Sequence, residues 1–230
     1  MDWSKILESV ISGVISGVIS GIAVGLVVYG LDERRAKRER RLADFRIASN
    51  WKNTEPKVSL RDFDLAQKNL SGHKFTKANL ESAILSEAIL WGTGFEGANL
   101  RHADFRKSKM VGSKAANAIA VGANFSYATI TKKVDPENNF LSDFSKISLK
   151  GAKFIGARLN GVVLREASLR GTDFSKATVL ECDFTGADFN DSNWKKVKRV
   201  ENCIWKDIKF ADPENFPAYL WQEIEKQNAK

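Results

Sequence analysis

The chain has 230 residues, enough to bury a substantial core, and it carries 36 Lys and Arg against 28 Asp and Glu. Its two cysteines do not make a disulfide framework, and its two histidines are too few for a metal or catalytic cluster. Composition therefore gives no reason to expect a disulfide-stabilised secreted scaffold, and no metal or other cofactor is expected.

The first predicted element is a transmembrane helix. Val10 to Leu31 is a run of 22 residues without a charge, and as a helix it would span roughly 33 Å, enough to cross a bilayer. A cleavable signal peptide would have a positive start and a shorter apolar stretch, so an uncleaved anchor fits better. Basic residues follow directly, which predicts a single-pass protein of the inner (cytoplasmic) membrane with its N-terminus outside and the rest in the cytoplasm.

Small residues recur every four positions within this segment. They are Gly13, Gly17, Gly21 and Gly25, flanked by Ser12, Ser16 and Ser20. Such a glycine zipper lets two helix backbones approach closely, and serines can hydrogen-bond across the contact. We expect these residues to form helix–helix contacts in a homo-oligomer. Two alternatives stay open, namely a lone anchor in which the glycines are tolerated and several copies that line a narrow pore.

A basic segment follows, because Asp32 to Arg41 holds six basic residues against three acidic ones. It contains good helix formers and could continue the helix out of the bilayer. Its basic side chains are predicted to contact anionic membrane lipid headgroups. They are Arg34, Arg35, Lys37, Arg38, Arg40 and Arg41. Nucleic-acid binding is the alternative for such a run, but the adjacent bilayer explains it more simply.

A five-residue period dominates the rest of the chain. From Leu60 to Met110 every fifth residue is large and apolar, and many have a small residue two positions earlier in a unit A-(N/D)-(L/F)-x-x. Neither a helix nor a flat strand generates this period, whereas a solenoid does. The loop 131–143 interrupts the series. A second series then runs from Phe144 to Trp194, and three more units follow a one-residue slip.

These motifs resemble the pentapeptide-repeat family over about Val58 to Phe210. The resemblance implies an all-β solenoid, a right-handed quadrilateral β-helix with four pentapeptides per coil and the apolar and small residues facing inward. Residues 20 apart would then stack. One expected aromatic column contains Phe154, Phe174 and Trp194, and part of another contains Leu85, Phe105 and Phe125. Cys182 and Cys203 occupy small inward positions and are expected to be core residues.

The expected domains are the transmembrane helix 1–31, a basic juxtamembrane helix and hinge 32–57, the β-helix 58–211 with its loop insertion 131–143, and a short C-terminal capping α-helix 212–230. A β-helix has open backbone edges at both ends, and these need covers. The hinge around Trp51 should cover the first coil. The last coil should be covered by Phe216, Tyr219, Leu220 and Ile224.

No catalytic constellation is recognisable, so we expect no enzyme activity and no small-molecule substrate. Some pentapeptide-repeat relatives bind DNA gyrase through an acidic, DNA-like surface. Outward positions here mix both charges, which argues against such mimicry, and no nucleic acid partner is expected. Apolar residues at outward positions instead suggest a candidate partner surface. It consists of Ile84, Ile89, Trp91 and Val111. Packing of these residues against the inserted loop or the covers is the alternative.

Two functional classes remain open. The first is a non-enzymatic, membrane-tethered scaffold whose rigid cytoplasmic rod serves protein–protein interaction with an unidentified cytoplasmic protein, or self-assembly. The second is a membrane effector whose glycine-zipper helix oligomerises and permeabilises the membrane under control of the repeat domain.

Overall fold

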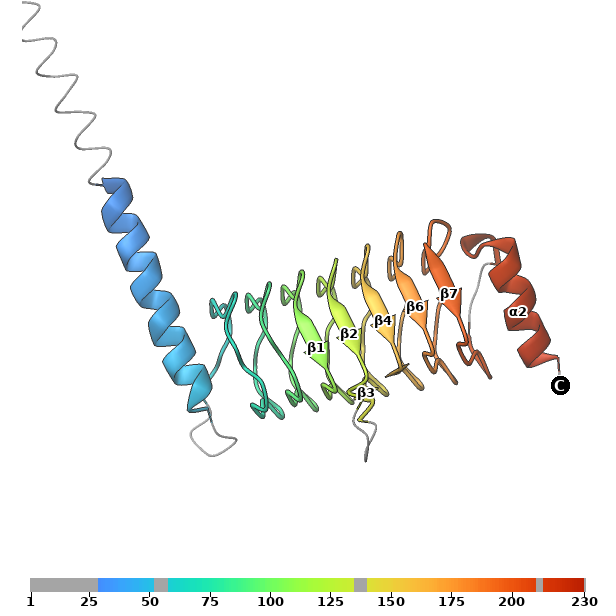
Figure 1. Ribbon diagram of the computed structural model, residues 1–230, viewed down its shortest axis with the longest axis horizontal. Coiled ribbons are helices and arrows are strands. Elements are labelled where there is room, and N and C mark those ends of the chain that lie inside the picture. The colour runs from blue at the N-terminus through green and yellow to red at the C-terminus, as the bar shows by residue number, and fades with distance from the viewer. Residues whose placement is uncertain (1–28, 52–57, 135–139, 210–212, 230) are drawn as a thin grey trace, which may run out of the picture. The chain divides into compact units, whose positions relative to one another are not determined.

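The computed structural model describes residues 29–51, 58–134, 140–209 and 213–229 of the chain (Figure 1). The chain divides into two compact units, Met1–Ala43 and Asp44–Lys230, and each is considered by itself.

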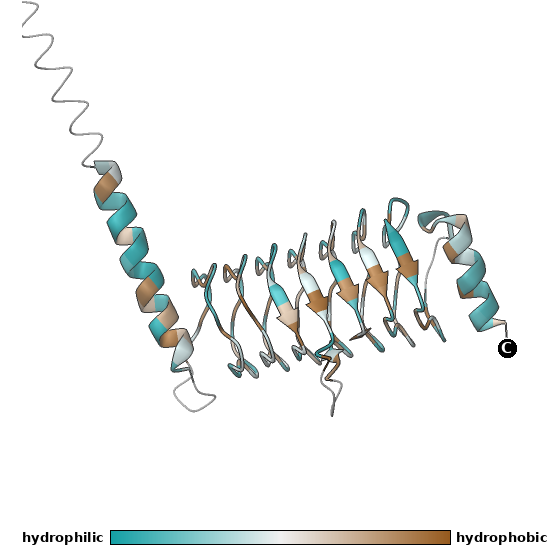
Figure 2. Ribbon diagram, viewed as in Figure 1, coloured by the Kyte–Doolittle hydropathy of each residue, from teal (hydrophilic) through white to brown (hydrophobic). Residues whose placement is uncertain are grey.

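The described part of the first unit belongs to a helix over residues 29–49, in which residues 31–40 are all solvent-exposed. Figure 2 shows that this helix is largely hydrophilic. Among the described residues, no helix combines the length and hydrophobicity that crossing a membrane requires. The predicted transmembrane segment Val10 to Leu31 lies outside the described residues except for its last three positions. The predicted glycine and serine contacts lie outside them entirely.

The second unit is a four-sided β-solenoid, as the five-residue period predicts. Parallel bridges join each coil to the next in four columns, which define four faces. Each column holds seven bridged residues. Face A contains Asp64, Ile84, Asp104, Asn124, Lys153, Asp173 and Asn193. Face B runs from Asn69 to Arg199, face C from Lys74 to Ile204, and face D from Asn79 to Lys209.

Face B carries the longest regular sheet, with the strand order β1-β2-β4-β6-β7 (Figure 1). A two-stranded sheet, β3-β5, lies on face C. The strands are β1 (Lys109–Val111), β2 (Thr129–Thr131), β3 (Ser142–Asp143), β4 (Arg158–Asn160), β5 (Val162–Val163), β6 (Thr178–Leu180) and β7 (Arg199–Glu201). The predicted C-terminal helix is present as α2 (Ala218–Asn228), preceded by the 3-10 turn η1 (Pro213–Asn215).

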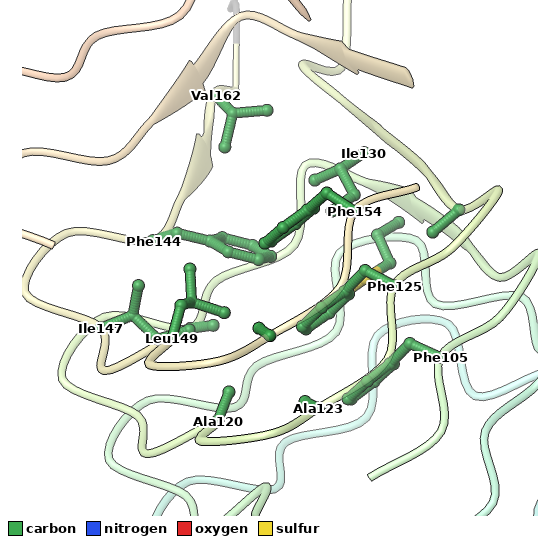
Figure 3. Packing of buried hydrophobic residues seen from close by; sticks show 14 of the residues in the cluster. Phe105, Ala120, Ala123, Phe125, Ile130, Phe144, Ile147, Leu149, Phe154 and Val162 are labelled. Carbon is green, nitrogen blue, oxygen red and sulfur yellow. The ribbon is translucent and has the colours of Figure 1, made fainter. Parts of the chain in front are cut away.

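The central apolar residue of each repeat and the small residue two before it point into the solenoid, where nearly all are fully buried. On face A the aromatic rings form one continuous stack. The ring centroids of Phe105, Phe125, Phe154, Phe174 and Trp194 follow one another at 4.8, 5.0, 4.9 and 4.1 Å. Figure 3 shows the rings of Phe105, Phe125 and Phe154 lying one above the other.

This stack corrects the prediction of two separate aromatic columns. The chain leaves the repeat after Thr131 and returns to it at Ser142, and Asn124 bridges Lys153, 29 residues away, where other coils advance by 20. The nine additional residues are thus accommodated outside the coil. Phe125 and Phe154 therefore become neighbours, although counting 20 residues separates them.

Each corner of a coil is a tight turn that explains the preferred residues. The backbone N–H of Ala78, for example, donates to the carbonyl of Phe75 at 2.9 Å, and Lys77 within this turn has φ +59°. A positive φ at the third residue is typical of a type II turn, which favours glycine. The Asn or Asp that precedes the apolar residue accepts a hydrogen bond from the backbone N–H two residues later, as Asn79 does from Glu81 at 3.2 Å. This Asx turn closes the corner and explains the repeat's Asn and Asp.

The two departures from the repeat have local causes. The inserted segment begins and ends as a hairpin in which Lys133 and Phe140 exchange backbone hydrogen bonds of 2.7 and 3.2 Å. The later one-residue slip is a β-bulge, because the backbone N–H groups of Lys198 and Arg199 both donate to the carbonyl of Ala177.

Both ends of the solenoid are covered. At the first coil, the Asp44 carboxylate accepts a hydrogen bond from the backbone N–H of Asp64 at 2.9 Å, and the Trp51 indole donates to the carbonyl of Val58. At the last coil, Phe216, Leu220 and Ile224 are buried, whereas Tyr219 remains mostly exposed.

Side-chain amides of α2 also complete the backbone hydrogen bonding of the last coil. Gln227 accepts from the N–H of Trp205 and donates to the carbonyl of Cys203, and Asn228 bonds Asp207 and Trp205 in the same way, all at 2.8–3.1 Å. The sequence did not reveal this role for the two amides.

Candidate functional site

Trp91 is the most prominent apolar side chain on the faces of the solenoid. It follows the buried Leu90 at the corner between faces B and C, and its carbonyl accepts a hydrogen bond from the N–H of Gly72 at 2.8 Å. The next residue, Gly92, has φ +62° and open space beside it. The backbone is thereby fixed, and the side chain of Trp91 is 53 % exposed.

The other predicted members of the partner surface lie around Trp91. Val111 ends β1 one coil further on and is half-buried, and its carbonyl accepts from Gly92 at 2.8 Å. Ile89 precedes Leu90 on face B and is also half-buried. Because neighbouring coils are about 4.8 Å apart, these three side chains are adjacent. Ile84 is 37 % exposed but lies on face A, around a corner from Ile89.

The inserted hairpin adds apolar side chains that the sequence analysis did not include. Val134 and Phe140 are 76 % and 48 % exposed, and Leu141 is similarly exposed. The base of the hairpin lies against Gly112, the residue after Val111, since a Cβ there would meet the Cβ atoms of Lys133 and Phe140 at 3.3 and 3.7 Å. The signal in the sequence was the apolar pair Phe140-Leu141 within a segment interpreted only as a loop.

The structure therefore supports part of each earlier interpretation. The hairpin packs on the corner at Gly112, as the alternative to a partner surface proposed, but Trp91 and Phe140 remain exposed. We use the name Trp91 surface for Ile89, Trp91, Val111, Val134, Phe140 and Leu141. A contiguous apolar surface of this kind is typical of a contact site for another protein.

The residues predicted to contact lipid lie on the helix over 29–49. Arg34, Arg35, Lys37, Arg38 and Arg40 are fully exposed, and Arg41 is half-buried. Their exposure is compatible with contact to an anionic surface.

The polar side chains that are buried or paired have structural roles. Burial acts to raise the pKa of Asp183, but hydrogen bonds from Thr185 and Arg165 outweigh it and lower that pKa. His73 stacks on Phe75 and contacts the carbonyl of Ser71, while His102 lies at the corner after face D. Across the described residues, His, Cys, Asp and Glu side chains form no group of three or more that could hold a metal ion. The arrangement favours binding over chemistry.

Comparison with known proteins supports the repeat assignment. The family model described as pentapeptide repeats matches eight copies, in residues 57–92, 98–132 and 142–179. A search of curated proteins gives no match.

Among solved structures, the chain is similar to a trypsin-treated form of QnrB1, a plasmid-mediated fluoroquinolone resistance protein, with 24 % identity over 70 % of this chain and 82 % of that chain and a TM-score of 0.30. It is also similar to the pentapeptide repeat protein Rfr23 from the cyanobacterium Cyanothece, with 17 % identity, coverage of 65 % and 88 %, and a TM-score of 0.31. HetL from the cyanobacterium Nostoc, a pentapeptide repeat protein involved in heterocyst differentiation regulation, gives 22 %, 68 %, 86 % and 0.26. At these TM-scores the similarities carry no information on function. The family match and the five-residue side of every coil show that the solenoid of this chain belongs to the pentapeptide-repeat family.

Proposed function

We propose that this protein is a non-enzymatic interaction scaffold, in which the solenoid presents the Trp91 surface to a protein partner or to a second copy of itself at the cytoplasmic membrane. The observation that carries the proposal is the exposure of Trp91 and Phe140 on a backbone that is hydrogen-bonded from coil to coil. Tryptophan is enriched among the residues that dominate binding energy at protein interfaces. A side chain held on a rigid backbone also loses little conformational entropy when it binds.

The proposed membrane attachment rests on separate features. The charge-free segment Val10 to Leu31 is long enough to span a bilayer, and exposed basic residues of the helix over 29–49 follow it. Each Lys or Arg near an anionic leaflet contributes about 1 kcal/mol of attraction. The tether would restrict the search for a partner to the membrane surface.

Site-specific photo-crosslinking in cells tests the scaffold proposal. A photoreactive phenylalanine analogue replaces Trp91 in the full chain, and the same analogue replaces Tyr127 in a matched control, because Tyr127 is equally exposed on another corner. We expect a discrete adduct from position 91 that disappears when Phe140→Glu is added, and none from position 127. An adduct of twice the chain mass would identify self-assembly, and a different mass a partner. Equal adducts from both positions, or none from position 91, would contradict the proposal.

A second candidate, the membrane effector, is favoured by one observation, the four-residue spacing of Gly13, Gly17, Gly21 and Gly25. It predicts a defined oligomer in mild detergent and membrane depolarisation on expression, and Gly17→Leu should abolish both. A monomeric full chain that leaves the membrane potential unchanged would leave the scaffold as the better description.

A further inference from the structure

Cys182 and Cys203 occupy the same inward position in two successive coils. They immediately precede the bridged pair Asp183 and Ile204, and the N–H of Ile204 donates to the carbonyl of Cys182 at 2.9 Å. Neighbouring strands lie about 4.8 Å apart, which falls within the Cα separation of roughly 4.4–6.8 Å that a disulfide accepts. The two thiols are free and are in hydrogen-bonding contact with each other.

A cavity of about 390 Å³ opens onto one of these thiols. It lies between the last coil and α2, and Glu201, Cys203 and Trp205 line it on one side. Tyr219, Leu220 and Glu223 line it on the other. Cys203 is 6 % exposed, whereas Cys182 is fully buried in the preceding coil. A small molecule in the cavity would therefore meet Cys203 first, with Cys182 directly behind it.

The two thiols differ in how readily they lose a proton. The hydrogen bond from Cys182 lowers the pKa of Cys203, because it stabilises the Cys203 thiolate. Burial raises the pKa of Cys182 well above its ordinary value. Since the thiolate is the nucleophile, Cys203 is the more reactive thiol of the pair. The carboxylate of Glu181 opposes the effect on Cys203, and we therefore expect a slow reaction that needs excess oxidant.

We propose that Cys203 and Cys182 form an oxidation-sensitive dithiol site, in which a small hydroperoxide enters the cavity at the C-terminal cap and the pair closes to a disulfide. In the first step the Cys203 thiolate attacks a peroxide oxygen. The O–O bond breaks, an S–O bond forms, and the departing hydroxide takes up a proton to leave as water. In the second step the Cys182 sulfur attacks the sulfenic acid at Cys203, an S–S bond replaces the S–O bond, and a second water leaves. Two thiols lose two electrons in total, and the peroxide gains them.

The disulfide would join the last coil covalently to the one before it. The carbonyl of Cys203 accepts a hydrogen bond from Gln227 at 3.1 Å, so the linked residue is also one that holds α2. Oxidation would thus act on the end of the solenoid where only a helix covers the backbone edge.

Mass spectrometry of the purified full chain in detergent tests the site. After treatment with hydrogen peroxide, denaturation and alkylation, we expect a loss of about 2 Da and no alkylated thiol, with both thiols recovered by dithiothreitol. Cys182→Ser cannot close the disulfide and should accumulate a sulfenic acid that dimedone traps, whereas Cys203→Ser should show little dimedone adduct. The proposal is wrong if both thiols remain alkylatable under conditions that fully oxidise free glutathione, or if Cys203→Ser is trapped as readily as Cys182→Ser.

A second measurement does not depend on the folding of either variant. In the untreated wild-type protein, peptide mapping after a brief exposure to iodoacetamide should show Cys203 modified about tenfold or more ahead of Cys182. Equal labelling of the two would contradict the assignment of Cys203 as the reactive thiol.

Discussion

The contact between Phe125 and Phe154 allows a quantitative test of the aromatic stack that runs past the inserted segment. The two ring centroids are 5.0 Å apart and the ring planes differ by 4°. We consider a double-mutant cycle in which each phenylalanine is changed to leucine, alone and together. Leucine keeps the site apolar and fills most of the volume, so the structure should persist while the ring stacking is lost.

The magnitude follows from the geometry. Each single substitution removes stacking with two neighbours, since Phe125 also contacts Phe105 at 4.8 Å and Phe154 contacts Phe174 at 4.9 Å. We expect each to lower the free energy of unfolding by about 1–3 kcal/mol. The pair should be coupled by about 0.5–1.5 kcal/mol, the energy of one aromatic contact beyond its buried area. If the rings belonged to separate columns, the two effects would add within about 0.3–0.5 kcal/mol.

Urea unfolding of the full chain in detergent supplies the four free energies. Phe75 and Phe174 serve as the control pair, because they lie on faces C and A in the first and sixth coils. Their substitutions to leucine should be additive. A coupling for Phe125 and Phe154 no larger than that of the control pair would refute the continuous stack.

Three further outcomes are expected. Gly171→Ala should cost about 1–2 kcal/mol in urea unfolding from backbone strain alone, because Gly171 has φ +62° and an added Cβ would meet nothing closer than 3.9 Å; an unchanged stability would show that the turn tolerates alanine. Gln227→Ala should expose the last coil, since the N–H of Trp205 loses its acceptor, and faster amide hydrogen exchange at Trp205 than in wild type measures this; unchanged exchange there would argue against the cap. Although burial alone would raise the pKa of Asp183, hydrogen bonds lower it, so its stabilisation is present above the unfolded-state pKa and is lost as pH falls through the folded-state value. The stability difference between wild type and Asp183→Asn should therefore narrow in acid, and a constant difference would contradict this.

The five-residue period predicted the solenoid because the buried side chain of every repeat is itself the signal. Leu60, Leu80 and Leu100 are apolar for the same reason that they are fully buried. The Asn and Asp of the repeat were visible as a pattern, but their function as Asx-turn acceptors required hydrogen-bond geometry. Non-glycine residues at positive φ, such as Tyr127 and Glu166, carry no sequence signal at all.

The misplaced aromatic column and the incomplete partner surface share a cause. Stacking by counting 20 residues assumes that the chain never leaves the coil, and the hairpin at Lys133 and Phe140 breaks that assumption. Phe140 was therefore assigned to a loop without a surface. The amides of Gln227 and Asn228 were missed for a different reason, because a polar side chain near the end of an exposed helix looks the same whether or not a backbone edge lies beneath it.

The hairpin between Thr131 and Ser142 also bears on how such a protein can change over evolutionary time. The nine residues added there leave the pairing of Val111 with Thr131 before them and of Ser142 with Val162 after them in register. Each coil contacts only its neighbours, so a corner can lengthen without disturbing coils further away. Lineages could therefore diversify the tip of this hairpin by insertion and deletion, and acquire new recognition properties, while the rest of the rod is inherited unchanged.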